Sequence, residues 1–181
     1  MNDKRRRFEA QVLPHLDAAY NLARWLARSP ADADDIVQEA ILRAYRGFDG
    51  FRGGDAKPWL LAIVRNCFFT TFAQARRRMH VPLPEGSAPY DDAAFIDEAP
   101  DPELVTIRAD RGRKLDQIIA VLPQEFREVL ILREMEDLSY RDIAQVTGSP
   151  IGTVMSRLAR ARALLKERWL REVEGARDGM Q

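Results

Sequence analysis

Basic and hydroxyl side chains share one face of a predicted helix in the last third of the chain. The polar set, which follows helical spacing, comprises Thr153, Ser156, Arg157 and Arg160. The apolar stripe on the opposite side comprises Val154, Leu158, Ala161 and Leu165. Arginine can pair bidentately with guanine, and hydroxyls can contact bases or phosphate oxygens. Taken alone, such a face equally fits a solvated helix surface.

The segment directly before this helix favours DNA contact. Ser139 and Asp142 have the spacing of a capping box, and Gly148 can take the positive φ that ends a short helix. Ser149-Pro150 then begins the next helix at once. Two short helices joined by a glycine turn form a helix-turn-helix, whose second helix enters the major groove of DNA. The sequence therefore predicts DNA contact by the polar set.

Two further features in the first half are consistent with nucleic-acid binding, but each has a plain alternative. The stretch Phe51 to Lys57 combines glycines, a basic residue and neighbouring aromatics, which is how unstacked bases are held. The aromatics Phe48, Phe51 and Trp59 equally suit closing a small core, and for Trp59 this is the preferred interpretation. The run Arg76 to Arg78 fits either nucleic-acid contact or a solvated helix end.

The sequence contains no recognisable motif for enzymatic catalysis or metal binding. Cys67 is the one cysteine, and its place beside Ile63 and Val64 predicts a packing role. Neither His15 nor His80 has an evident acid–base partner, and no nucleophile set or phosphate loop stands out. We therefore expect no catalytic residue, no cofactor and no metal. Without a secretory signal or a long apolar run, a cytoplasmic protein with no membrane insertion is expected.

The net charge of zero conceals a segregated distribution. Residues 1–79 carry 14 basic and nine acidic side chains, residues 80–110 carry one and eight, and residues 111–181 carry 13 and 11. The acidic segment also contains Pro82, Pro84, Pro89, Pro100 and Pro102. Dense prolines and like charges oppose regular structure and extend a chain. We predict a domain over 1–79, a flexible linker over 80–110 and a second domain over 111–181.

Apolar spacing predicts helices in both domains. The stripe from Phe8 to Leu26 indicates one helix, the acidic run Asp32 to Asp35 indicates the cap of a second, and Pro58 suits the first turn of a third. Leu115 to Leu122, stopped by Pro123, begins the helices of the second domain. The predicted fold class is all-α, with two small helical domains, of which the C-terminal one contains the helix-turn-helix.

In this order and spacing, the motifs resemble the sigma-70 family, and specifically the extracytoplasmic-function (ECF) sigma factors. Asp32 to Tyr45 is similar to the helix with which the family docks on the clamp helices of the RNA polymerase β′ subunit. Phe51 to Asn66 is similar to the segment that melts the promoter and reads its minus-ten element. Leu122 to Leu130 and the helix-turn-helix are similar to the domain for the minus-thirty-five element.

The resemblance implies a non-enzymatic role in transcription initiation. It implies that Asp35, Gln38 and Glu39 bind core RNA polymerase, with further contact to the β subunit. It implies that Arg52, Lys57, Arg65 and Asn66 hold unstacked bases, and that the polar set on the last helix reads duplex promoter DNA. An anti-sigma factor is the usual inhibitor in this family, and is expected as a partner.

Two departures from the family pattern concern details of DNA recognition. Pro58 stands where the family often has a hydroxylic residue, and Met155 where it often has a basic one. An alternative is a helix-turn-helix regulator that acts independently of core polymerase. It explains the second domain equally well, but not the acidic helix and glycine-aromatic loop of the first.

Overall fold

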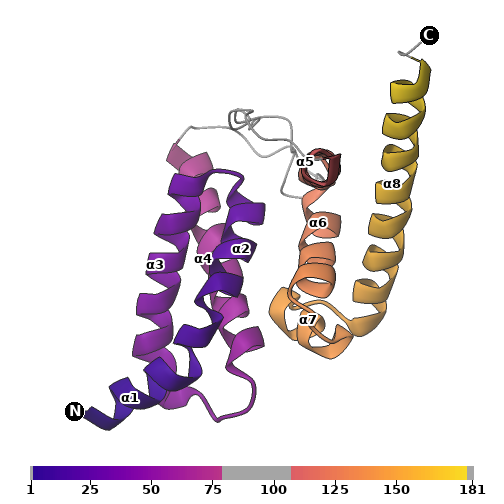
Figure 1. Cartoon of the computed structure of the whole chain (residues 1–181). Coiled ribbons are helices and arrows are strands. Elements are labelled where there is room, and N and C mark those ends of the chain that lie inside the picture. The colour runs from indigo at the N-terminus through magenta and orange to yellow at the C-terminus, as the bar shows by residue number, and fades with distance from the viewer. Residues whose placement is uncertain (1, 79–106, 179–181) are drawn as a thin grey trace.

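The computed structural model describes residues 2–78 and 107–178, and every regular element in these ranges is helical. The elements form two groups, α1 to α4 and α5 to α8 (Figure 1). This confirms the predicted all-α fold with two helical domains. Most of the predicted linker lies outside the described residues. Residues 107–110, which were assigned to that linker, belong to the helix α5 (Ile107–Ala120).

The first domain begins with two helices where one was expected. The first helix α1 (Asn2–Gln11) is separated from α2 (Leu16–Ala27) by a 3-10 turn over Leu13–His15. Pro14 lies in this turn, and a proline cannot donate the hydrogen bond that a continuous helix needs. The apolar stripe nevertheless runs across the break, because Phe8, Val12 and Leu22 are all buried.

The cap of α3 (Pro30–Gly47) differs from the expected one. The Ser29 hydroxyl oxygen accepts a hydrogen bond from the backbone N–H of Asp32 at 3.4 Å, and Pro30 occupies the first turn. Ser29 therefore caps the helix, and the assignment of the cap to Asp32–Asp35 was wrong. The sequence also indicates acidic residues in the first turn, where the helix dipole favours negative charge, and Asp32 lies there. A 3-10 turn over Phe48–Gly50 and a loop then lead to α4 (Ala56–Arg78).

The core of the first domain is formed where α2, α3 and α4 pack on one another. Small residues on α2 and α3, among them Ala19, Ala23, Ala40 and Ala44, are fully buried. Alanine at such positions allows helices to approach closely, and larger side chains from α4 fill the remaining space. These are Leu60, Leu61, Val64, Cys67 and Phe68.

The second domain contains α5, α6 (Gln124–Leu130), α7 (Tyr140–Thr147) and α8 (Ile151–Asp178). The guanidinium of Arg127, almost fully buried, donates to the backbone oxygens of Ala120 (2.7 Å) and Leu122 (3.1 Å) and so fixes the end of α5. A π-helical turn over Ile131–Met135 continues α6, and Asp137 then reverses the chain at a φ of 53°.

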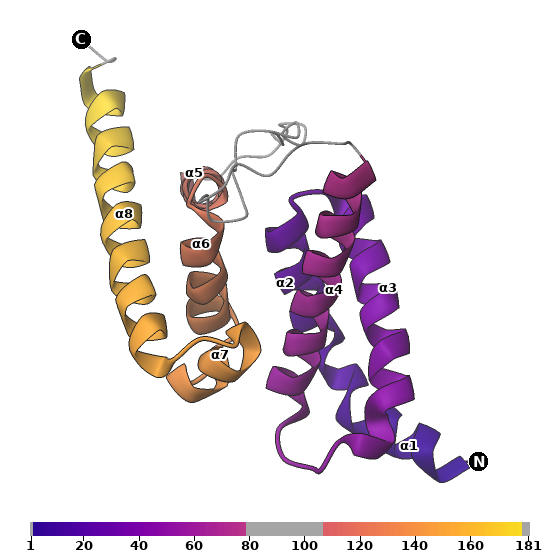
Figure 2. The same cartoon turned by 180° about the vertical axis from the view of Figure 1, so that it is seen from behind.

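The two domains pack against each other through α2 and α4 on one side and α6 and α7 on the other (Figures 1 and 2). Both views place α3 on the side of the first domain that faces away from the second. Residues 127–132 are consecutively buried, which is more than one face of a helix. The first domain therefore covers the side of α6 that α8 leaves open.

Gly148 provides a test of the helix-turn-helix geometry. It ends α7 at a φ of 64°, and a Cβ built there meets nothing within 4 Å. Gly148→Ala should lower the free energy of unfolding by about 1 kcal/mol through backbone strain alone. The matched control is Gly152→Ala in α8, which also meets nothing within 4 Å and has no positive φ. Urea denaturation should show no loss of stability for the control; equal effects would contradict the left-handed turn.

Candidate nucleic-acid interface

The helix-turn-helix is set by its caps. The Ser139 hydroxyl accepts from the backbone N–H of Asp142 at 3.1 Å, and so begins α7 as predicted. The backbone N–H of Gly148 bonds to the Ala144 carbonyl, and that of Ser149 bonds to the same oxygen at 3.1 Å. The chain then enters α8 with the N–H of Val154 bonded to the Pro150 carbonyl. The predicted turn between the two helices is therefore present.

The face of α8 opposite its core contact is partly exposed. Val154, Leu158 and Ala161 are buried, as predicted for the apolar stripe, and Leu165 is half-buried. Ser156 and Arg160 are exposed, and Thr153 is half-buried. Arg160 forms no ion pair within the part of the chain that the structure describes. Helical spacing places these side chains on one surface of α8, and their chemistry is suited to DNA.

Arg157 is held within its own domain. Its guanidinium donates to the Ser149 hydroxyl at 3.2 Å and lies 3.7 Å from a carboxylate oxygen of Glu125. The side chain is about one-quarter exposed, so it lies at the edge of the α8 surface. DNA contact by Arg157 remains a prediction, and it requires the guanidinium to leave Glu125 or to share it.

The aromatics of the glycine loop pack together. The Phe51 ring stacks on Phe48 with centroids 5.9 Å apart and contacts Trp59 at 4.8 Å. Phe48 is buried, whereas Phe51 and Trp59 are half-buried. These contacts favour core closure as the role of the aromatics. Gly53 and Gly54 take φ values of 86° and 95°, and Arg52 beside them is exposed.

The remaining residues predicted to hold unstacked bases have different surroundings. Asn66 is exposed on α4. Lys57 and Arg65, also on α4, form ion pairs with Glu136 and Glu128 of the second domain. The two acidic partners were not predicted, since nothing in the spacing of the second domain indicates that these glutamates meet α4. The side chains of Arg76 to Arg78 lie outside the described residues.

The outward face of α3 carries the residues predicted to bind polymerase. Asp35 and Gln38 are exposed, and the half-buried Glu39 accepts a hydrogen bond from Arg43 at 2.6 Å. Leu42 continues this face with 52% exposure. An apolar side chain within a polar surface is typical of a protein interface. Leu42 was not among the predicted residues, although its helical spacing from Asp35 and Gln38 places it on the same face. The role of these residues remains a prediction.

Three further findings concern the cysteine, possible metal ligands and possible membrane-spanning helices in the described residues. Cys67 is buried at 1% exposure, which confirms its packing role. No group of three or more histidine, cysteine, aspartate or glutamate residues within 2–78 and 107–178 is arranged to hold a metal ion. In the same ranges, no helix is both long and apolar enough to cross a bilayer.

Comparison with known proteins shows the family. Residues 12–78 match the model for sigma-70 region 2, and residues 112–165 match that for sigma-70 region 4. The chain belongs to the sigma-70 family of transcription initiation factors, within its group of ECF RNA polymerase sigma factors.

Several relatives are similar over most of this chain. An ECF sigma-E factor of Haemophilus influenzae is 35% identical over 81% of this chain and 78% of its own length. The sigma-H factor of Pseudomonas aeruginosa is 34% identical over 87% and 83%. The ECF sigma factor SigE of Mycolicibacterium smegmatis is 33% identical over 86% of this chain, which spans 59% of that longer relative.

Solved structures show the same architecture. The sigma factor RpoE of Bartonella quintana, solved in complex with the anti-sigma factor NepR, is 29% identical. Its TM-score is 0.69 over 90% of this chain and 96% of that one. A second structure, CnrH in complex with the cytosolic domain of CnrY, has a TM-score of 0.59 over 90% and 87%. At 23% identity, it shows the fold alone.

Burial predicts that Cys67 is chemically inert in the folded protein. Removal from water raises the pKa of the Cys67 thiol, although the positive charge of Arg43 opposes this. Less thiolate is then present at a given pH, and the sulfur is also inaccessible. Alkylation at pH 8 should be roughly a hundredfold slower in the native protein than in urea, because it requires local opening. Equal rates, followed by mass spectrometry, would contradict the packing role.

Proposed function

We propose that the protein is an ECF sigma factor that binds core RNA polymerase, recognises promoter DNA and directs transcription initiation. One observation carries this proposal: a chain of the sigma-70 family exposes two surfaces of different chemistry. The outward face of α3 presents Asp35, Gln38 and Leu42, and the helix-turn-helix presents Ser156 and Arg160. One surface suits a protein partner, and the other suits DNA.

Each surface takes a defined role in this proposal. The α3 face, with Glu39 beside it, binds the β′ clamp helices, and the β subunit adds further contact. Arg52, Lys57, Arg65 and Asn66 hold unstacked bases of the minus-ten element. Thr153, Ser156, Arg157 and Arg160 contact the minus-thirty-five duplex. The protein contributes binding and no catalytic group, since nucleotide chemistry belongs to the polymerase.

Location and control follow from these partners. The protein works in the cytoplasm, where polymerase and promoters are found. An anti-sigma factor controls it, which is supported by the similar sigma factor of Bartonella quintana in complex with its anti-sigma factor. The alternative is a regulator that binds a DNA site without polymerase. The second domain alone would suit it, but the match of residues 12–78 to sigma-70 region 2 favours the sigma factor.

The DNA surface can be tested at Arg160. With purified core polymerase on genomic promoter fragments from the source organism, run-off transcription should yield transcripts that depend on this protein. Arg160→Ala should reduce initiation about 5- to 100-fold, the range expected when a base or phosphate contact is lost. Arg171→Ala is the control, because that exposed arginine pairs with Glu167 farther along α8. An unchanged rate for Arg160→Ala would remove Arg160 from the interface.

The polymerase surface can be tested on α3. Asp35→Ala combined with Gln38→Ala should weaken core binding about tenfold or more, in the range typical of interface positions. Fluorescence anisotropy of the labelled protein titrated with core enzyme measures this directly. Asp17→Ala on α2 removes the same charge from another exposed position and should leave binding unchanged. Failure of the wild-type chain to bind core polymerase would instead contradict the sigma-factor proposal.

A further inference from the structure

Two apolar side chains are exposed at the start of α8. Ile151 and Met155, here called the apolar pair, are 44% and 52% exposed. Their spacing of four residues places them one turn apart on the same side of the helix. Met155 is also one of the two positions at which the sequence departs from the family pattern. A single exposed apolar residue is ordinary on a protein surface, but a contiguous pair beside a binding surface is a candidate contact.

The apolar pair borders the polar surface of α8 that suits DNA. Ser156 directly follows Met155, and Arg160 lies one turn farther along; both are exposed. Helical spacing places Gly152 and Ala159 between the apolar pair and these polar residues, and both are exposed as well. A Cβ built at Gly152 meets nothing within 4 Å, so the surface beside the pair is open. Small residues here allow the helix backbone to approach base edges closely, which brings the apolar pair within reach of them.

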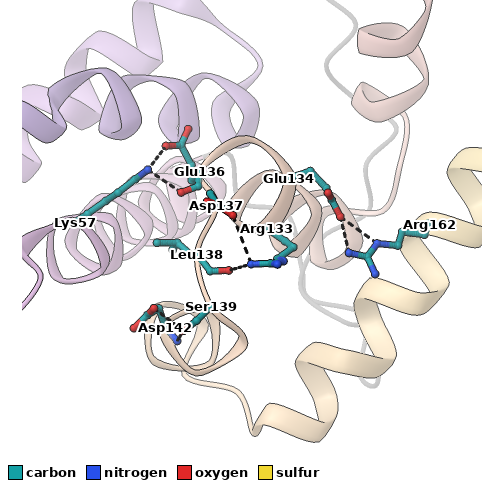
Figure 3. Close-up of polar contacts among 9 residues, drawn as sticks. All are labelled: Lys57, Arg133, Glu134, Glu136, Asp137, Leu138, Ser139, Asp142 and Arg162. Carbon is teal, nitrogen blue, oxygen red and sulfur yellow. Dashed lines mark hydrogen bonds and ion pairs between the residues drawn. The ribbon is translucent and has the colours of Figure 1, made fainter.

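The arginines that flank this part of α8 are held by their own domain. Arg162 lies on the same side of the helix as Met155 by helical spacing. Its guanidinium donates to a carboxylate oxygen of Glu134 through Nε at 3.0 Å and Nη2 at 2.6 Å (Figure 3). On the opposite flank, Arg157 is held near Glu125. The side of α8 that carries the apolar pair therefore offers apolar contact and no arginine that is free of a carboxylate.

The major groove of DNA contains one apolar group that such a pair can contact, the C5-methyl group of thymine. A helix-turn-helix places the first turns of its second helix against the base edges. The apolar pair lies in these turns, because α8 begins at Ile151. Four residues of helix rise about 6 Å, which is less than two base-pair steps of about 3.4 Å each. Both side chains can therefore reach methyl groups within three successive base pairs.

We infer that Ile151 and Met155 are specificity-determining residues that select thymine in the minus-thirty-five element through its C5-methyl group. This inference rests on the proposed function, because it uses α8 as the helix that enters promoter DNA. Ser156 and Arg160 supply polar contacts, and the apolar pair adds a contact that only a methylated base can make. Contact removes the methyl group and the apolar side chains from water, which is favourable. The element that this protein recognises then contains thymine within a window of three base pairs.

The first test removes the methyl group and leaves base pairing intact. Active promoters from the run-off experiment are rebuilt with each thymine of the minus-thirty-five element replaced in turn by deoxyuridine, which lacks only the C5-methyl group. Initiation is measured with core polymerase and the full-length chain at limiting concentration. Within one window of three base pairs, replacement should lower initiation about fourfold, the effect expected from one buried methyl group. Thymines outside the window are the internal control and should tolerate the replacement.

The second test assigns the methyl contact to the apolar pair. Met155→Ala should initiate about fourfold less on the thymine promoter and should no longer distinguish thymine from deoxyuridine at the position that Met155 contacts. Ile151→Ala should lose the distinction at a thymine in the same window. Both side chains are exposed, so these changes leave the core intact. The matched control is Leu170→Ala, because Leu170 is an apolar residue with 47% exposure farther along α8; this variant should keep the full preference for thymine.

The outcomes separate this inference from the proposed function. Equal losses on deoxyuridine for wild type and both variants would mean that the methyl group acts through DNA shape, and would exclude the inference. Active promoters without thymine in this element, or with no loss at any replaced thymine, would exclude it too. If Met155→Ala keeps the thymine preference but weakens core binding in the anisotropy titration, the apolar pair contacts protein instead. The sigma role stands in all these cases; if wild-type protein starts no transcription, both proposals fail.

Discussion

The burial of Glu128 is the constraint on which the arrangement of the two domains depends. A carboxylate at 2% exposure is costly unless it is paired and hydrogen-bonded, and Arg65 of the other domain supplies this pairing. A buried ion pair contributes little net stability, because desolvation offsets most of the attraction. It does strongly disfavour alternative arrangements in which one charge is left alone. The pair therefore specifies how α6 meets α4 more than it holds the domains together.

This balance matters because water can hydrate the same charged groups once the domains separate. When the domains separate, Glu128 regains hydration, which repays part of the lost contact. The packing of α4 on α7 and of α2 on α6 also opposes separation. A modest differential affinity of a partner for the separated form is sufficient to shift such an equilibrium. The α3 face lies away from this interface, so the polymerase contact proposed for it does not require the domains to separate.

Local structure was predictable wherever the residues that determine it lie within the same short segment. Ser139, Asp142 and Gly148 specify the ends of α7 by capping and by a positive φ, and the structure has these features as expected. The apolar stripe of α8 was equally clear, because helical spacing places Val154, Leu158 and Ala161 together. The first domain was less certain at its boundaries. Pro14 divides a continuous stripe, and Ser29 caps α3 although acidic residues offered an equally plausible start.

What the sequence did not indicate are contacts between residues far apart along the chain. Glu128 stands beside Arg127, and either one could have been a solvated charge of an amphipathic helix. Only the enclosure of α6 by both domains makes both side chains buried, with Arg127 turned to the end of α5 and Glu128 to Arg65. The family resemblance, and not their spacing, assigned Lys57 and Arg65 to DNA contact. The charge that would suit these two side chains to DNA also makes them partners for any suitably placed carboxylate, as the ion pairs with Glu136 and Glu128 show.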